Sequence, residues 1–183
     1  LVVTDSGVPE AYAKTVAAQC GQPVTVTIEQ GEKSKNPDNF LKLLSVMLEN
    51  SFTRKDCVVA VGGGVVGDLS GFAAACYMRG IDFYNIPTTL LSQIDSSVGG
   101  KTAVDFNGVK NAIGAFYQPK KVVIDPTVLK TLDSRQLHAG LAEAIKMAAT
   151  SDEKLFELLE KSSDLQKDLP QIIERALLIK KKV

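Results

Sequence analysis

Short apolar runs alternate with longer amphipathic segments along the first two thirds of the chain. The runs are rich in β-branched and aromatic residues, as buried strands are, and cover residues 1–4, 24–28, 57–61, 81–86 and 121–125. The longer segments carry apolar residues at helical spacing and cover residues 9–20, 36–50 and 69–75. Strands that alternate with helices predict an α/β domain with a mainly parallel sheet and helices on both faces.

The pattern changes after Pro126, where helical spacing continues without another run of the strand type. Helices are predicted over residues 134–149, 152–161 and 170–183. We therefore predict a boundary between residues 126 and 133. It separates an α/β domain of residues 1–128 from the start of an all-α domain at residues 129–183.

Gly62, Gly64 and Gly67 form a G-x-G-x-x-G pattern between a predicted strand and a helix. Without side chains, the N–H groups of such a turn and the helix N-terminus can approach a pyrophosphate, which favours a Rossmann-like dinucleotide site. A tight turn packed against its own sheet would show the same glycines. The acidic residue that an ordinary Rossmann site places about 20 residues further on is missing, because Asp82 stands at the start of its strand.

Two lysine-containing segments suit anion binding. Residues 95–102 end in Gly-Gly-Lys-Thr, as a P-loop does, but Asp95 stands where a P-loop needs glycine and a helical pattern precedes it, which excludes a P-loop kinase or ATPase. The turn before Lys101 either offers N–H groups and an ammonium to one phosphate or is a flexible surface turn. Lys110 and Asn111 likewise form an anion site or a solvated loop.

Glu143 and Lys146 lie three residues apart on a predicted helix that is otherwise rich in alanine, leucine, isoleucine and methionine. The pair is either an ion pair on the helix surface or a carboxylate metal ligand beside a substrate-binding lysine. His138 is the only histidine, so no histidine-rich metal site is expected, and we interpret it as a helix-face residue.

Composition excludes several classes of partner. Hydrophobic residues make up 45% of the chain and 21 basic residues balance 21 acidic ones, so no net field would recruit nucleic acid or an anionic membrane. No apolar run reaches the roughly 20 residues of a spanning helix, and no leader opens the chain. The three cysteines form no C-x-x-C pair, which favours a reducing cytoplasm. Because no methionine precedes Leu1 and a helical pattern stops at Val183, we expect a fragment whose first strand and helical domain are truncated.

Four segments, taken in order, resemble the 3-dehydroquinate synthase family of sugar-phosphate cyclases: residues 62–69, 87–102, 110–114 and 139–146. The resemblance implies an NAD-binding α/β domain, a helical domain with a zinc or cobalt ion, a sugar phosphate held between them, and a homodimer. The implied reaction converts 3-deoxy-D-arabino-heptulosonate 7-phosphate to 3-dehydroquinate and phosphate, in the shikimate route to chorismate and the aromatic amino acids.

The resemblance also assigns roles to individual residues. NAD contacts are implied for Glu32, Lys35, Gly63, Gly64, Asp68, Thr88, Thr89, Lys101, Lys110, Thr131 and Leu132. Substrate contacts are implied for Arg79, Asp95, Lys101, Asn111, Lys146 and Lys180, with Arg79 reaching the phosphate from a neighbouring subunit. Glu143 matches the first metal ligand, and the family's two histidine ligands lie beyond Val183. We therefore expect no turnover from these 183 residues alone.

Three other functions stay open. A metal-dependent polyol or alcohol dehydrogenase shares the G-G-G-x-x-x-D turn, but such enzymes continue from the aspartate into Ala-Lys, whereas Leu69 and Ser70 follow Asp68 here. Another sugar-phosphate cyclase is disfavoured by the Lys110–Asn111 pair. A non-catalytic nucleotide-binding module would bind NAD without a metal and without releasing phosphate.

Overall fold

A parallel sheet of five strands forms the centre of the molecule, in a computed structural model that describes residues 1–182. Its strands follow the order β2-β1-β3-β4-β7, and all neighbouring pairs are parallel. Their bounds are β1 (Val2–Asp5), β2 (Thr25–Ile28), β3 (Cys57–Gly62), β4 (Asp82–Pro87) and β7 (Lys121–Val122). The predicted parallel sheet is confirmed. The last strand is shorter than predicted because Asp125 already caps the following 3₁₀ turn.

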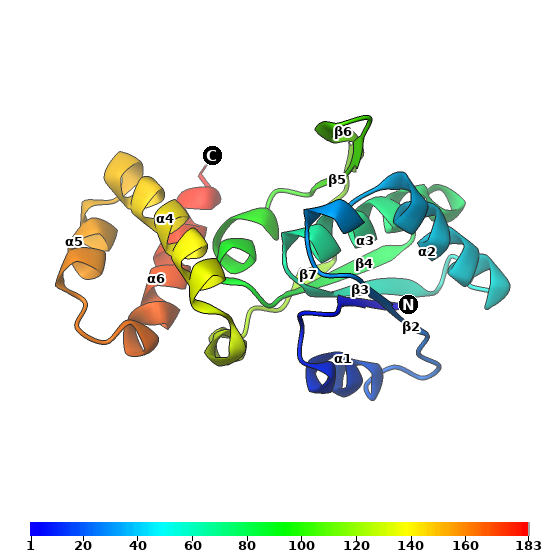
Figure 1. Cartoon of the computed structure of the whole chain (residues 1–183), viewed down its shortest axis with the longest axis horizontal. Helices are drawn as coiled ribbons and strands as arrows, with labels where there is room; N and C mark the ends of the chain where they lie inside the picture. Colours follow the sequence, from blue (N-terminus) through cyan, green and yellow to red (C-terminus); the bar gives the residue numbers. More distant parts are fainter. Residues whose placement is uncertain (183) are drawn as a thin grey trace.

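Helices cover both faces of the sheet, as predicted (Figure 1). Helix α1 (Glu10–Ala17) packs on one face, where Val2, Val59 and Val61 meet it. Helices α2 (Pro37–Glu49) and α3 (Gly64–Cys76) cover the other face. Successive strand residues alternate between the two faces, so an uninterrupted run of valines supplies both cores.

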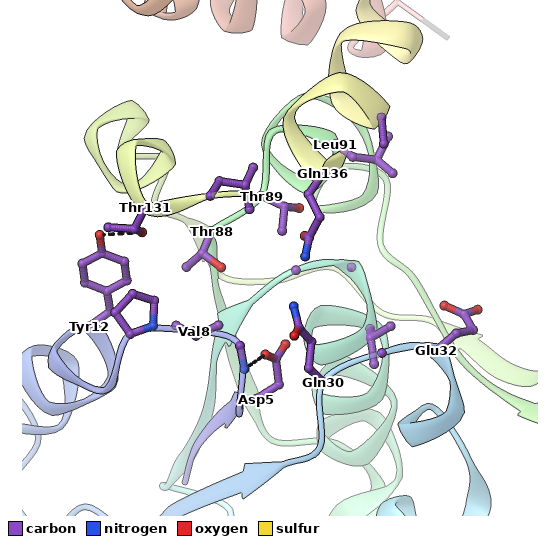
Figure 2. Close-up of a pocket in the computed structure, with 18 residues that line it drawn as sticks. Asp5, Val8, Tyr12, Gln30, Glu32, Thr88, Thr89, Leu91, Thr131 and Gln136 are labelled. Carbon is purple, nitrogen blue, oxygen red and sulfur yellow. Dashed lines mark hydrogen bonds between the residues drawn. The ribbon is translucent and has the colours of Figure 1, made fainter. Parts of the chain in front are cut away.

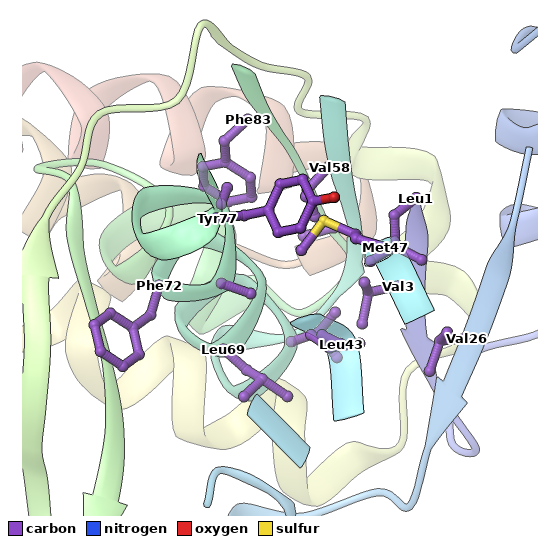
Figure 3. Close-up of a cluster of buried hydrophobic side chains, with 14 of the residues drawn as sticks. Leu1, Val3, Val26, Leu43, Met47, Val58, Leu69, Phe72, Tyr77 and Phe83 are labelled. Atoms are coloured by element: carbon purple, nitrogen blue, oxygen red, sulfur yellow. The ribbon is translucent and has the colours of Figure 1, made fainter. Parts of the chain in front are cut away.

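The larger core lies between the sheet and helices α2 and α3 (Figure 3). Leu43 and Met47 of α2 and Leu69 of α3 are completely buried there. Helix α3 begins at Gly64, five residues before the predicted start, because the glycine turn runs directly into it. A Cβ on Gly71 would lie 2.5 Å from Thr102 Cγ2, so the small residues of α3 allow a neighbouring strand to pack closely against it.

A hairpin of two antiparallel strands, β5 (Lys101–Phe106) and β6 (Val109–Phe116), projects from the sheet (Figure 1). No strand was predicted here. A turn does precede Lys101, at residues 97–99, whereas the loop predicted at residues 110–111 was wrong because these residues lie in β6. The hairpin turns at Asn107 and Gly108, which both have positive φ angles of 49° and 77°. Asn-Gly is a typical sequence for such a turn. Most of β6 is exposed, so it carries no apolar alternation that would reveal a strand.

Three helices follow the sheet, as predicted: α4 (Ser134–Ser151), α5 (Glu153–Lys161) and α6 (Leu165–Lys180). Helix α6, capped by Asp164, begins at Leu165, five residues before the predicted start at Pro170, which the helix accommodates in its interior. The predicted end at Val183 lies outside the described residues. The helices share a buried cluster that also includes Leu90 and Ile94, so the boundary after residue 128 stays a prediction. Within residues 1–182, every helix is too short or too polar to cross a membrane.

Candidate functional site

A cavity of about 330 Å³ opens at the carboxyl ends of the strands. The chain passes from β1 to β2 on one side and from β3 to β4 on the other, so the connections that leave the neighbouring strands β1 and β3 run in opposite directions. In open α/β sheets, ligands bind in the crevice at such a point. The structure places the following predicted NAD residues on the cavity wall: Glu32, Gly63, Gly64, Thr88, Thr89, Thr131 and Leu132.

The glycine turn between β3 and α3 has two structural roles. A Cβ on Gly62 would lie 2.6 Å from Val66 Cγ2, and a Cβ on Gly67 would lie 3.1 Å from Asn85 Nδ2, so these two glycines permit close packing. Gly63 and Gly64 instead expose backbone at the cavity, next to the N-terminus of α3. A helix N-terminus favours negatively charged groups, so this wall suits a pyrophosphate.

Several cavity residues were missed by the sequence analysis. Asp5, Gln30 and Gln136 point toward the space between the loops (Figure 2). Asp5 accepts a hydrogen bond from Gly7 N at 2.8 Å, and burial raises the pKa of its carboxyl. A polar residue at the carboxyl end of the first parallel strand is the signal that would have found Asp5.

Asp82, about 20 residues after the glycine turn, does not line the cavity. The glycine turn follows β3, not β1, so the usual spacing of about 20 residues does not lead to the cavity. Asp82 does begin its strand, as predicted, and its carboxylate lies 3.5 Å from Lys120 Nζ. The acidic residue that does line the cavity is Glu32, in the loop after β2.

A buried lysine connects the cavity to the hairpin. Lys35 is only 5% exposed, and its Nζ lies 3.1 Å from Glu32 Oε1 and 3.3 Å from Asp68 Oδ2. The same Nζ donates to Asn111 Oδ1 at 2.8 Å. Lys110 Nζ lies 3.4 Å from Glu32 Oε1. Five residues that were predicted as cofactor or substrate contacts therefore form one charged cluster.

Burial and charge act against each other in this cluster. Burial raises the pKa of Asp68 to about 6, although the Lys35 ammonium lowers it in part. Burial alone would lower the pKa of Lys35, but the charges of Asp68 and Glu32 and their hydrogen bonds outweigh it and raise that pKa. Lys35 therefore stays a cation in the working pH range, and Asp68 is the group whose charge changes there.

Replacing Asp68 with asparagine should remove a pH dependence of stability. The raised pKa of about 6 means that the folded chain keeps a proton on Asp68 that the unfolded chain releases near 3.8. This stabilisation is complete below the unfolded value and is lost as the pH rises through the folded one. From about pH 5 to about pH 7, the free energy of unfolding of the unsubstituted chain should fall by about 1 kcal/mol relative to Asp68→Asn. Urea denaturation at each pH measures the free energy of unfolding of both proteins. If it changed equally with pH in the unsubstituted chain and in Asp68→Asn, the prediction would be wrong.

Two more ion pairs lie toward the helical part of the molecule. Lys180 Nζ lies 2.6 Å from Asp95 Oδ1, which joins α6 to the turn that follows β4. Lys146 Nζ lies 2.6 Å from Glu143 Oε1 on α4, so the pair predicted on this helix is formed, and Glu143 raises the pKa of Lys146. Among residues 1–182, no three histidine, cysteine, aspartate or glutamate side chains are grouped to hold a metal ion. The residues present therefore do not fit a complete metal site.

The last two predicted residues lie apart from the main cavity. Lys101 borders a small pocket with Asp68, Asn85 and Ser97. Arg79 is exposed and lines neither of these pockets. Its φ angle of 70° lies in the left-handed region, and the neighbouring residues Met78 and Gly80 also have positive φ angles.

Comparison with known proteins assigns the family. Residues 25–139 match the family model described as 3-dehydroquinate synthase N-terminal. The chain belongs to the 3-dehydroquinate synthase family. It is 46% identical over 186 residues to the 3-dehydroquinate synthase of Sulfurimonas denitrificans. This match covers 100% of this chain and 53% of that protein. It is 50% identical over 182 residues to the 3-dehydroquinate synthase of Vibrio atlanticus, in a match that covers 97% of this chain and 49% of that protein. The chain thus spans about half the length of these relatives.

Solved sugar-phosphate cyclases have the same fold. A 2-deoxy-scyllo-inosose synthase, complexed with carbaglucose-6-phosphate, NAD⁺ and Co²⁺, superposes with a TM-score of 0.90 at 29% identity and covers 100% of this chain and 53% of that one. A 2-epi-5-epi-valiolone synthase from Streptomyces hygroscopicus, with NAD⁺ and Zn²⁺ bound, gives 0.89 at 33% identity, with 97% and 53% covered. An iron-containing alcohol dehydrogenase gives 0.71 at 13% identity, which shows a shared fold alone.

Proposed function

We propose that the complete protein is a 3-dehydroquinate synthase, which converts 3-deoxy-D-arabino-heptulosonate 7-phosphate to 3-dehydroquinate and phosphate in the cytoplasm. One observation carries the proposal. Lys35 joins Glu32, on the wall of the switch-point cavity, to Asn111, which the family motif assigns to the substrate. Residues that the family motif assigns to the cofactor and to the substrate thus lie in contact through Lys35, as a reaction between the two molecules would require.

In this proposal, NAD occupies the cavity at the carboxyl ends of the strands. Its pyrophosphate would lie against the backbone of Gly63 and Gly64, where the N-terminus of α3 favours negative charge. Glu32 and Asp5 would accept hydrogen bonds from ribose hydroxyls, because both carboxylates line the same cavity. Bound NAD supplies transient oxidation of a substrate hydroxyl. The residues around it orient the dinucleotide and exclude water.

The substrate would lie beside the cavity, among the lysines that the motifs select. Lys101, Lys146 and Lys180 would neutralise its carboxylate and phosphate, and Asn111 would orient its hydroxyls. Lys146 and Lys180 now pair with Glu143 and Asp95, so a bound anion would compete with these carboxylates. Arg79 would reach the phosphate in the partner of a homodimer, in line with its exposed position away from the cavity of its own chain.

A zinc or cobalt ion belongs to the same proposal. Glu143 would be one of its ligands, since its carboxylate is largely buried on α4, with 20% of the side chain exposed, and carboxylate oxygens bind such ions. A catalytic zinc site normally takes three protein ligands. We therefore expect the 183 residues by themselves to bind NAD without releasing phosphate.

The test uses the complete gene product, supplied with NAD, zinc or cobalt and 3-deoxy-D-arabino-heptulosonate 7-phosphate. We expect stoichiometric phosphate release together with a product whose dehydration gives an enone absorbance, and no net accumulation of NADH. Accumulation of NADH with a polyol substrate would establish the dehydrogenase instead. NAD binding without phosphate release would establish a non-catalytic module.

A further inference from the structure

The hairpin carries an irregularity next to its functional residues. Its two strands pair regularly from Lys101 opposite Phe116 to Val104 opposite Ile113, and again at Phe106 opposite Val109. Between these pairs, Asp105 of β5 faces the three residues 110–112 of β6. Bulges of this kind bend a strand and redirect its side chains.

At this irregularity, Asp105 forms hydrogen bonds both with β6 and with the buried Lys35 segment. Its carboxylate Oδ1 accepts a hydrogen bond from Asn111 N at 2.8 Å. Its own backbone N donates to Lys35 O at 2.9 Å, and its Oδ1 lies 3.8 Å from Lys35 Nζ. Asp105 therefore bonds both to the bulge and to the buried lysine that the bulge contacts.

The bulge is held in a conformation that a free strand would not adopt. Asn111 has a φ angle of 53°, in the left-handed region, and asparagine tolerates this region better than most residues. In this conformation its side chain reaches Lys35 Nζ, and the preceding Lys110 reaches Glu32 on the cavity wall. A strand in regular register would turn alternate side chains to opposite faces instead.

We propose that Asp105 is a positioning residue, which holds the Lys110–Asn111 bulge so that its side chains face the cofactor and the substrate. The proposal rests on the proposed function, since it deepens the role of Asn111 in substrate binding. Asp105 acts through its hydrogen bond to the Asn111 amide and does not itself contact the substrate. An acceptor oxygen at this position is therefore the required feature, and the negative charge is not.

The test compares Asp105→Ala with Asp105→Asn in the complete gene product. Asp105→Ala should lower kcat/KM for the sugar phosphate about tenfold or more. The Kd for NAD should change by less than about threefold, because most residues assigned to NAD line the cavity and are unchanged, whereas Lys110 is 73% exposed and lies outside the cavity wall. Asp105→Asn keeps an acceptor oxygen and should restore kcat/KM to within about threefold. The matched control is Asp56→Ala, which removes a carboxylate that accepts from Thr53 N at 2.6 Å in an exposed turn at the amino end of β3.

Hydrogen exchange provides a second readout that does not depend on turnover. Peptides that cover residues 106–116 should exchange faster in Asp105→Ala than in the unsubstituted protein, and Asp56→Ala should not change them. An unchanged kcat/KM in Asp105→Ala, or an asparagine variant as impaired as the alanine variant, would overturn the proposal. If the unsubstituted protein releases no phosphate, the proposed function fails, and unchanged exchange in residues 106–116 would then also refute the role of Asp105.

Discussion

Replacing Lys35 with methionine should lower the free energy of unfolding by about 3 kcal/mol. Methionine fills a similar volume but leaves Asp68, Glu32 and the Asn111 Oδ1 atom without their shared cation. Breaking a buried ion pair from one side costs roughly 3–5 kcal/mol. The lower value applies here, because Asp68 can take up a proton near pH 6 and because 41% of the Glu32 side chain is exposed to solvent.

Urea denaturation at neutral pH measures this loss, and Lys14→Met serves as the matched control. Lys14 makes an ion pair with Glu10 on α1 at 2.8 Å, but both side chains are largely exposed. Exposed pairs of this kind contribute about 0.5 kcal/mol or less. Equal losses in the two variants would show that Lys35 is not the centre of the buried cluster.

The strands of the sheet could be predicted because they are buried on both faces, so each is a short, almost uninterrupted apolar run. The hairpin could not be found in that way. Only Thr102 and Val104 of β5 are buried, and β6 is almost entirely exposed, so neither strand shows a clear pattern. The signal that was present is the Asn107–Gly108 dipeptide, which is typical of a tight hairpin turn. Pattern reading failed here because this hairpin does not contribute a continuous face to the core.

Some residues of the candidate site could be predicted from the sequence, and others could not. Motifs identified the glycine turn, because backbone approach to a phosphate requires small residues at a fixed spacing. They could not show that loops after four different strands meet in one cavity, since this depends on the strand order β2-β1-β3-β4. Asp5 was missed for this reason: its position is informative only once β1 is known to lie beside β3, with its carboxyl end at the cavity. The central position of Lys35 likewise follows from contacts with residues 33 and 76 positions away along the chain.

Replacing Gly63 with valine should weaken NAD binding by about a hundredfold or more, which corresponds to about 2.7 kcal/mol. Gly63 has a φ angle of −78°, which any residue can adopt, so backbone strain does not contribute. The loss of affinity is expected from steric crowding. A Cβ at this position would lie 3.0 Å from Thr89 Cγ2, and both residues line the cavity. The branched side chain would therefore crowd the wall where we expect the pyrophosphate to approach the backbone.

Isothermal titration of the complete protein with NAD measures this effect, with Gly21→Val as the control. Gly21 lies between α1 and the amino end of β2, does not line the cavity, and a Cβ there would meet nothing within 4 Å. The control should bind NAD with unchanged affinity. A Gly63→Val protein that melts like the control but no longer binds NAD would place the dinucleotide at the glycine turn. Retention of the full affinity would mean that Gly63, like Gly62 and Gly67, serves only the packing of the turn against its own sheet.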